Sequence, residues 1–370
     1  MNNLIKYMEE VQDFRDGFNL KHKLSDILTI AILAILSGAE TWNAIELYGK
    51  QRLDMLKRFL ELPSGIPSHD TFNRVFAMLD PARLEAALSN WVRSLVPDLE
   101  GEHIAIDGKS IRGSNKPTSH SFVHMVSAFA CGNGISLAQV KVDEKSNEIT
   151  AIPKLLDMLD VRGCTISIDA MGCQKDIAAK IIQGRGDYIL AVKENQPSLH
   201  LDALLMGRTC RPDDVFTETD GGHGRVETRT TSIYRDMDYV SNFWAGAAAV
   251  IKVETRRFNK TEGKYDAAQS RYFITSRNSV KAEDFSRWVR AHWGIENRLH
   301  WVLDMAFNED ASQKRAGNSA ENFSRMLRLA RNILKVYKEE SRTRLSYRLM
   351  MFKAAMDPEF PLEVLRTVFA

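Results

Sequence analysis

Two apolar runs that each end in an aspartate are the feature that most constrains how this chain folds. The run at 104–106 leads into Asp107, and the β-branched run at 165–168 leads into Asp169. Short apolar runs rich in β-branched residues predict buried strands. Each strand is therefore expected to deliver one carboxylate to the edge of a sheet. Asp107 and Gly108 taken alone fit a hairpin turn, but the second copy of the pattern favours a site.

Basic residues follow the first aspartate. Lys109 and Arg112 come shortly after Asp107 in the chain. Carboxylate oxygens are ligands for hard cations such as Mg²⁺, and lysine and arginine side chains contact phosphate oxygens. A carboxylate flanked by two cations therefore suits a site that handles a metal and a phosphate.

The chain around the two aspartates has the pattern of an α/β core. Two strand-like runs within 122–142 are separated by a good hairpin turn, Cys-Gly-Asn-Gly at 131–134. Apolar residues at helical spacing predict a helix over 149–159. A helix over 175–183 and a strand over 187–192 follow. The order strand, hairpin, helix, strand, helix, strand predicts a mixed five-stranded sheet with helices, which is the order of a ribonuclease-H-like core.

The N-terminal segment, residues 1–97, is predicted to be a separate helical module. Helices are expected over 24–37, 42–50, 52–60, 68–78 and 81–95. The helix after Ser68 has this serine as its N-cap and polar residues near its start, as in the second helix of a helix-turn-helix. Two interpretations stay open: the helix contacts base edges of DNA, or it only packs on its neighbours.

Residues 205–277 are rich in Thr, Val and Tyr, which predicts a β-rich insertion that interrupts the core. Strands are expected over 215–218, 225–234, 247–257 and 271–275. A glycine-rich loop carries His223 and Arg225, and a second basic cluster contains Arg256, Arg257, Lys260 and Lys264. Glycine lets a backbone approach a phosphate closely. The loop is therefore either a phosphate contact or a solvated hairpin tip.

A helix is predicted over 282–310, where the chain returns to the core. Glu296 lies one turn from His292 and one turn from His300, so the three residues share a face. The spacing allows a His/Glu/His metal site, or a third carboxylate for a hard metal with both histidines contacting DNA or packing. No other soft ligands converge on this helix, which favours the carboxylate.

The last part of the chain is basic. Residues 312–348 hold ten Lys or Arg and three Asp or Glu. A helix from Asn322 places an apolar stripe on one face and Arg325, Arg328 and Arg331 on another. This pattern predicts a basic ridge that binds a polyanion, rather than a solvated charged face.

The expected domain boundaries follow from these segments. They are a helical DNA-binding or assembly domain at 1–97, the first part of the catalytic core at 98–204, the insertion at 205–277, the second part of the core at 278–340 and a helical tail at 341–370.

Composition narrows the class of protein. An apolar content of 44% is ordinary for a globular chain, and a formal net charge of +2 does not by itself indicate a nucleic-acid partner. The four cysteines have neither metal-type spacing nor a secretory context, which favours reduced thiols in the cytoplasm. The apolar stretch 27–36 is shorter than the ~20 residues that a bilayer span needs, so no membrane partner is expected.

Six short motifs together resemble one protein family. They are IDGKSIRG at 106–113, EKSNEI at 144–149, IDAMGCQ at 168–174, VKENQ at 192–196, HGR at 223–225 and HWGIEN at 292–297. From about residue 13 to about residue 335, the chain is similar to the H-repeat-associated, ISAs-type insertion-sequence transposases, which are DDE transposases.

The resemblance implies a bacterial DNA transposase whose ribonuclease-H-like core is split by a β-domain before the final glutamate. Carried over by position, Asp107, Asp169 and Glu296 are the expected catalytic carboxylates and metal ligands, with two Mg²⁺ ions per site and Mn²⁺ as a substitute. The expected reaction is strand cleavage at the element's ends and strand transfer into target DNA. The expected partner is double-stranded DNA, comprising terminal inverted repeats and target, bound by a homodimer in the cytoplasm at the nucleoid.

The residues expected to contact DNA have cationic or polar side chains near the strand ends, in the insertion or on the late helices. They are Lys109, Arg112, Lys193, Asn195, His223, Arg225, Arg290, His292, Arg325, Arg328 and Arg331. The broader group has Tyr seven residues before its glutamate, Arg four before and Lys seven after, whereas this chain has Val289, His292 and Leu303. Arg290 fits a basic position common in that group. Because these three residues differ from the pattern of the broader group, the sequence does not decide whether cleavage passes through a DNA hairpin intermediate.

Other assignments stay open on the sequence. A nuclease or resolvase on the same fold would cut branched or hybrid substrates, and a domesticated DNA-binding protein or an inactive relic would not cut. The nominal alternatives to Glu296 as third carboxylate are Glu194, Asp304, Glu309 and Asp310. Glu296 is favoured because it alone follows the aromatic-rich segment 288–293, which would pin the helix to the sheet.

Overall fold

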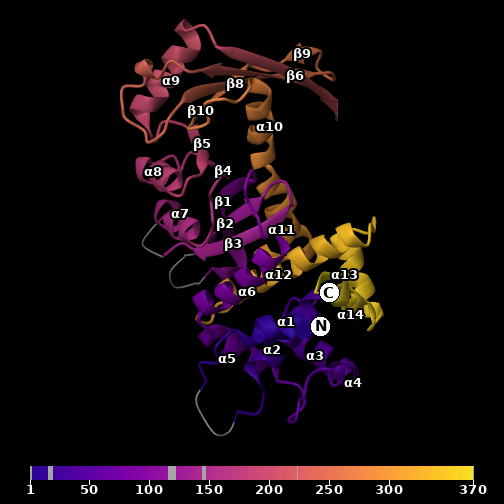
Figure 1. Ribbon diagram of the computed structural model, residues 1–370. Coiled ribbons are helices and arrows are strands. Elements are labelled where there is room, and N and C mark those ends of the chain that lie inside the picture. Colours follow the sequence, from indigo (N-terminus) through magenta and orange to yellow (C-terminus); the bar gives the residue numbers. More distant parts are fainter. Residues whose placement is uncertain (1, 16–19, 116–121, 144–146, 223, 370) are drawn as a thin grey trace.

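The computed structural model describes residues 2–15, 20–115, 122–143, 147–222 and 224–369. In this part of the chain, ten strands form one sheet in the order β3-β2-β1-β4-β5-β10-β8-β7-β6, and β9 pairs with β8. Figure 1 shows the insertion strands at one end, the first five strands in the middle, and the N-terminal helices at the other end. The predicted class, a mixed α/β sheet with helices, is confirmed.

The first half of the sheet contains the predicted strands and hairpin. The strands are β1 (His103–Ile111), β2 (Val123–Ala130), β3 (Ile135–Lys141), β4 (Thr165–Ile168) and β5 (Asp187–Val192). β1 is antiparallel to β2 and parallel to β4, and β5 is parallel to β4. The β2–β3 turn closes with a 2.8 Å hydrogen bond from Gly134 N to Ala130 O. Gly134 has a φ of 66°, a conformation that glycine adopts without strain.

The β-rich insertion extends the first half of the sheet. Its strands are β6 (Asp214–Gly222), β7 (Arg225–Tyr234), β8 (Ala249–Asn259), β9 (Lys264–Tyr265) and β10 (Gln269–Thr275). β10 pairs antiparallel with β5, in the register Tyr272 to Val192. The pairing satisfies the backbone groups on the outer side of β5, which would otherwise form an open sheet edge. The sequence did not predict this continuity, because strand pairing is a long-range property.

The segments that carry the motifs also form helices, and these helices pack on the sheet. They are α7 (Glu148–Asp157), α8 (Lys175–Gln183), α9 (Pro197–Thr209), α10 (Ala282–His292) and α11 (Trp301–Phe307), with a π-helical turn η3 (Glu296–His300) and short 3-10 turns η1 (Arg112–Ser114), η2 (Met237–Tyr239) and η4 (Glu309–Ala311). α10 packs on the insertion strands through Phe285 and Val289, which lie in one apolar cluster with Ile251 and Phe273. From there, α10, η3 and α11 run towards the middle of the molecule (Figure 1).

The N-terminal helices form a layer against the C-terminal ones. They are α1 (Asn2–Glu9), α2 (Leu24–Leu36), α3 (Trp42–Gln51), α4 (Leu53–Leu56), α5 (His69–Met78) and α6 (Pro81–Leu95), and they lie beside α13 (Tyr347–Met356) and α14 (Phe360–Val368). The predicted helices are confirmed, although the one expected over 52–60 is only the single turn α4. Ser68 caps α5 by accepting a hydrogen bond from Thr71 N at 3.3 Å, as predicted. Among the described residues, none of the helices combines the length and apolar character needed to cross a bilayer.

The prediction that α12 (Ser319–Glu340) carries an exposed basic ridge is wrong. Arg325, Arg328 and Arg331 are at most 3% exposed, because α12 is enclosed by α2, α5 and α6 on one side and by β2 and β3 on the other. Their guanidinium groups therefore serve as internal partners instead of a surface for a polyanion.

Each buried arginine has internal hydrogen-bond or ion-pair partners. Arg325 Nε lies 2.9 Å from Glu85 Oε2, and Arg328 Nη2 lies 2.5 Å from Glu85 Oε1. Arg331 donates to the carbonyl oxygens of Gly134 and Arg298. Glu85 belongs to α6, so these contacts join the N-terminal layer to α12.

Candidate active site

The register of two parallel strands places both aspartates at one edge of the sheet. Ile106 of β1 pairs with Ile168 of β4, so Asp107 and Asp169 are the next residues on neighbouring strands. β4 ends there, while β1 continues to Ile111 beside β2. Asp107 therefore lies within a strand rather than at its end, but beyond the last residue of its parallel neighbour.

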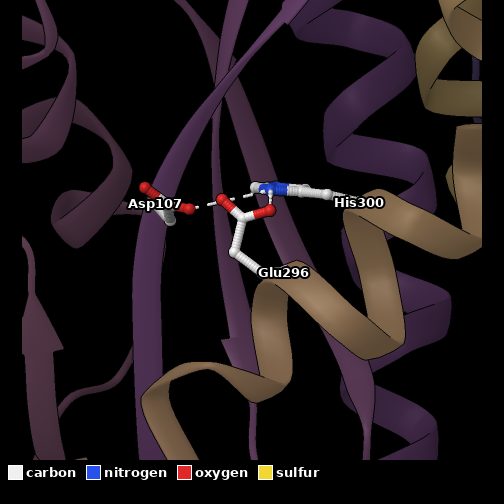
Figure 2. Close-up of side chains that lie close together, drawn as sticks. All are labelled: Asp107, Glu296 and His300. Carbon is white, nitrogen blue, oxygen red and sulfur yellow. Dashed lines mark ion pairs between the residues drawn. The ribbon is translucent and has the colours of Figure 1, made fainter. Parts of the chain in front are cut away.

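The side chains of Asp107, Glu296 and His300 point toward one another (Figure 2). The ligand atoms of Asp107, Glu296 and His300 all lie within 4.8 Å of one another. His300 Nδ1 is 3.7 Å from Asp107 Oδ2 and 3.7 Å from Glu296 Oε2. Glu296 and His300 are the first and last residues of the π-helical turn η3. Such turns are rare and occur frequently at functional sites.

Asp169 stands outside this tight group but faces the same cleft. Asp107, Asp169 and Glu296 line a cleft of about 600 Å³, together with Lys193 and His292. Asp169 Oδ1 accepts hydrogen bonds from Met171 N at 3.0 Å and Gly172 N at 3.4 Å. The structure therefore brings the three predicted carboxylates to one cleft.

The electrostatics of this cleft are those of a cation site. Burial, followed by the neighbouring Glu296 carboxylate, raises the pKa of Asp107 to about 8. Burial also raises the pKa of Asp169. The neighbouring His300 imidazole holds the pKa of Glu296 below its usual value. Carboxylates that approach each other in a partly buried site resist ionising together, and a divalent cation removes this penalty.

The donor atoms match a hard divalent cation. Three carboxylates offer oxygen ligands, which Mg²⁺ and Mn²⁺ prefer. His300 adds a nitrogen, and its other ring nitrogen, Nε2, is buried with no hydrogen-bond partner among the described residues. The sequence allowed either a His/Glu/His metal site or a third carboxylate without histidine ligands. The structure combines parts of both, because His300 lies beside Glu296 and Asp107 while His292 does not join this group.

A hydrogen-bond chain holds His292 at the wall of the cleft. His292 Nδ1 lies 2.8 Å from Ser167 Oγ, and Ser167 Oγ lies 2.8 Å from His103 Nε2. Burial lowers the pKa of His292 to about 4 and that of His103 to about 3. Both imidazoles are therefore neutral at physiological pH, and Ser167 fixes the orientation of the His292 ring.

A second pair of polar side chains lies close to Asp107 and packs against Gly108. His124 Nε2 and Glu148 Oε1 are 2.7 Å apart. A Cβ atom on Gly108 would come within 2.1 Å of that Glu148 oxygen. The charge of Glu148 also raises the pKa of Asp169. A side chain at position 108 would therefore displace the Glu148 carboxylate, and Gly108, which lies within β1, is not part of the hairpin turn considered from the sequence.

Two predicted DNA-contacting residues are used within the chain. Lys109 Nζ lies 2.7 Å from Asp304 Oδ1, 2.9 Å from Glu309 Oε2 and 3.1 Å from Asp310 Oδ1. Its side chain is 12% exposed, so the three acids, and not a phosphate, satisfy its charge. Asn195 Nδ2 donates to Ala170 O at 2.6 Å, which ties the loop after Asp169 in place.

The same contacts bear on the choice of the third carboxylate. Three of the alternative acids surround Lys109 and do not line the cleft: Asp304, Glu309 and Asp310. The fourth, Glu194, is exposed and is not a lining residue of the cleft either. Glu296 lines the cleft beside Asp107.

The remaining predicted DNA contacts differ in exposure. Arg112 is 82% exposed and Lys193 is exposed at the cleft, whereas Arg290 forms ion pairs with Glu218 at 2.9 Å and with Asp220. Arg225 is exposed at the start of β7. The His223 prediction lies outside the described residues.

His300 and Ser167 were not predicted as site residues. The spacing of His300 from Glu296 carried the only sequence signal for His300, and the absence of other soft ligands argued against it. No local pattern marks Ser167, because its contacts come from His103 on β1 and from His292 on α10.

Comparisons with known proteins give a consistent result. A family model described as "Transposase DDE domain" matches residues 98–333, and one described as "DDE_Tnp_1-associated" matches residues 5–92. The chain is 41% identical over 351 residues to the putative transposase YncI of Escherichia coli O157:H7, covering 92% of this chain and 89% of that protein. It is 39% identical over 377 residues to the H repeat-associated putative transposase YhhI of Escherichia coli strain K12, covering 99% and 98%.

One solved structure is similar at lower identity. It is the cryo-EM structure of the piggyBac transposase synaptic complex with hairpin DNA, with a TM-score of 0.45 and 13% identity. The match covers 99% of this chain and 77% of the piggyBac chain.

Proposed function

Because the chain belongs to the family of proteins with a transposase DDE domain, as its motifs predicted, we propose that it cuts DNA at the ends of an insertion sequence and joins them to target DNA. The observation that carries this proposal is the meeting of Asp107, Asp169 and Glu296 in one cleft. In this proposal, strands β1 to β5 and their helices form a ribonuclease-H-like core. The β-rich insertion lies between this core and Glu296 in the sequence.

The three carboxylates hold divalent metal ions in this proposal. Two Mg²⁺ ions, or Mn²⁺ in their place, would lower the pKa of an attacking water or 3′-hydroxyl and stabilise the leaving oxygen of an in-line phosphoryl transfer. Asp107, whose pKa is raised by burial and by the charges of Glu296 and Asp169, would give up its proton to bind a cation. The adjacent His300 imidazole favours the ionised form of the Glu296 carboxylate and would add a nitrogen to the ligand set.

Other residues of the cleft hold the DNA strand. Lys193 is exposed in the cleft and close enough to lower the pKa of Asp169 by its charge. We assign to Lys193 and Arg112 contacts with phosphates of the bound strand. Transposition joins two ends at once, so the acting form is a homodimer on double-stranded DNA, in the bacterial cytoplasm at the nucleoid.

Strand cleavage in vitro tests this function. The substrate is a duplex that carries the chromosomal sequence flanking the gene, including any inverted repeats, and product is detected on a denaturing gel. Wild-type protein should cut at a repeat end with Mg²⁺ or Mn²⁺ but not with Ca²⁺, because Ca²⁺ binds oxygen ligands in a looser geometry. Glu296→Gln should lose at least about a hundredfold in rate, as removal of a metal ligand disrupts the site.

Asp304→Asn is the matched control, because Asp304 lies on α11 beside Lys109 and outside the cleft. It should keep most of the cutting activity. Equal activity of Glu296→Gln and wild type, in folded protein that binds the duplex, would contradict the assignment. Cutting of branched DNA without preference for the repeat would instead indicate a nuclease or resolvase.

A further inference from the structure

A polar groove adjoins the cleft on the insertion side. It has a volume of about 580 Å³ and is lined by residues of α10, β7, β8 and β10 and of the turn after α10. Its charged lining residues are four arginines and one glutamate: Arg229, Arg257, Arg271, Arg290 and Glu227. The excess of positive charge makes the groove attractive to an anion.

Strand alternation explains why the arginines share one face. Arg271 pairs with Val253 across β10 and β8, and Arg257 lies on the same face of β8, four residues beyond Val253. Arg229 lies opposite Thr255, which is also on this face. The apolar part of the face, around Phe273, is covered by α10. Beside the last turns of α10 the face becomes basic, and this part is the groove.

The groove and the cleft are continuous. Arg271, Val289, Trp293 and Asn297 line both of them. The guanidinium carbon of Arg271 lies 6.0 Å from the centre of the Trp293 ring, which is 54% exposed. This cation–π contact holds the Arg271 side chain at the junction.

Arg271 differs from the other arginines of the groove in its partners. Arg229 and Arg257 form ion pairs with Glu227, and Arg290 pairs with Glu218. Within the described part of the chain, no carboxylate lies within ion-pair distance of Arg271. Burial, followed by the charge of Arg229, lowers the pKa of Arg271. A half-buried cation among other cations is costly unless an anion binds to it.

We propose that this groove binds the phosphate backbone of the DNA strand that leaves the catalytic cleft, and that Arg271 is the phosphate contact at the junction. The inference rests on the proposed function and adds to it a path for the substrate over the insertion strands. Arginine suits this task because its planar group binds phosphate oxygens in a bidentate manner. Trp293 acts as a positioning residue for Arg271.

The test is the salt dependence of DNA binding by the full-length protein in Ca²⁺, which avoids cutting. The probe is the duplex that carries the flanking sequence of the gene, and affinity is measured between ~50 and ~200 mM salt. Arg271→Ala should lower affinity and reduce the slope of log affinity against log salt by about one. Arg271→Lys keeps the charge and should restore the slope while recovering only part of the affinity.

Arg287→Ala is the matched control. Arg287 is on α10 and 67% exposed, and it pairs with Glu283 and Asp284 outside the groove. Its removal should leave the slope unchanged. Thermal melting accompanies every variant, and Arg271→Ala should melt no lower than wild type, because it removes an unpaired cation.

The outcomes separate this inference from the proposed function. An Arg271→Ala protein that is folded and binds with wild-type affinity and slope would overturn the groove assignment, whether or not wild-type protein cuts DNA. If Arg271→Ala changes the slope as expected while wild-type protein fails to cut in Mg²⁺, the groove stands and the proposed reaction fails.

Discussion

At the scale of single residues, the site depends on how Asp107 is held. It lies on a central strand, its side chain is 16% exposed, and His300 and Glu296 approach it from the π-helical turn. Burial and the adjacent carboxylate favour the protonated form of Asp107, while His300 favours the ionised form of Glu296. Two neighbouring carboxylates thus differ in protonation in the metal-free protein.

The raised pKa of Asp107 has a consequence for stability without metal. Between the ordinary carboxyl pKa of 3.8 and a pKa of about 8, folded protein retains a proton that unfolded protein has lost. The contribution of Asp107 to the free energy of unfolding therefore falls as the pH rises through this window. Asp107→Asn has no such proton and should melt at least roughly 2 °C above wild type at pH 8 in EDTA.

Thermal melting between pH 5 and pH 8, with EDTA or with Mg²⁺, measures this effect. Mg²⁺ should raise the melting temperature of wild type, because it binds the folded state only, and should raise that of Asp107→Asn much less. Asp70→Asn is the control, since Asp70 is 79% exposed on the N-terminal layer. Parallel pH profiles of wild type and Asp107→Asn would show that the Asp107 carboxyl is not in the environment described.

At the scale of elements, α12 decides how the two ends of the molecule are joined. Its sequence alternates apolar and basic residues in a way that normally gives an amphipathic surface helix. The helix is instead enclosed on both sides, and Glu85 of α6 neutralises Arg325 and Arg328. A local pattern cannot reveal such a buried pair, because the acid lies in a segment more than two hundred residues away.

Removing the acid of this cluster should be costly. Glu85→Gln removes the ion-pair partner of the buried Arg328 and one of the two acids that Arg325 contacts, the other being Glu321. Breaking a buried ion pair costs about 3–5 kcal/mol. Urea unfolding should show this loss, whereas Glu61→Gln, at a glutamate that is 71% exposed, should change the free energy of unfolding by less than about 0.5 kcal/mol. A loss below about 1 kcal/mol for Glu85→Gln would contradict the buried network.

At the scale of the whole molecule, the sequence predicted what is encoded locally. Strands β4 and β5, helix α8 and the β2–β3 hairpin follow from apolar runs, periodicity and turn residues, and the positions of Asp107 and Asp169 follow from where those runs end. The pairing of β10 with β5 and the approach of His300 to Asp107 depend on contacts between distant segments. Neither has a local pattern, which is why neither was predicted.

The central claim is that Asp107, Asp169 and Glu296 bind the metal ions of a DNA-cleaving site. Anomalous diffraction from Mn²⁺ in crystals of the protein bound to the flanking-sequence duplex tests it most directly. The account predicts Mn²⁺ in the cleft, with oxygen ligands from these three carboxylates and with a DNA phosphate beside it. Mn²⁺ bound elsewhere, for example between His124 and Glu148, with none at Asp107 and Glu296, would contradict the account.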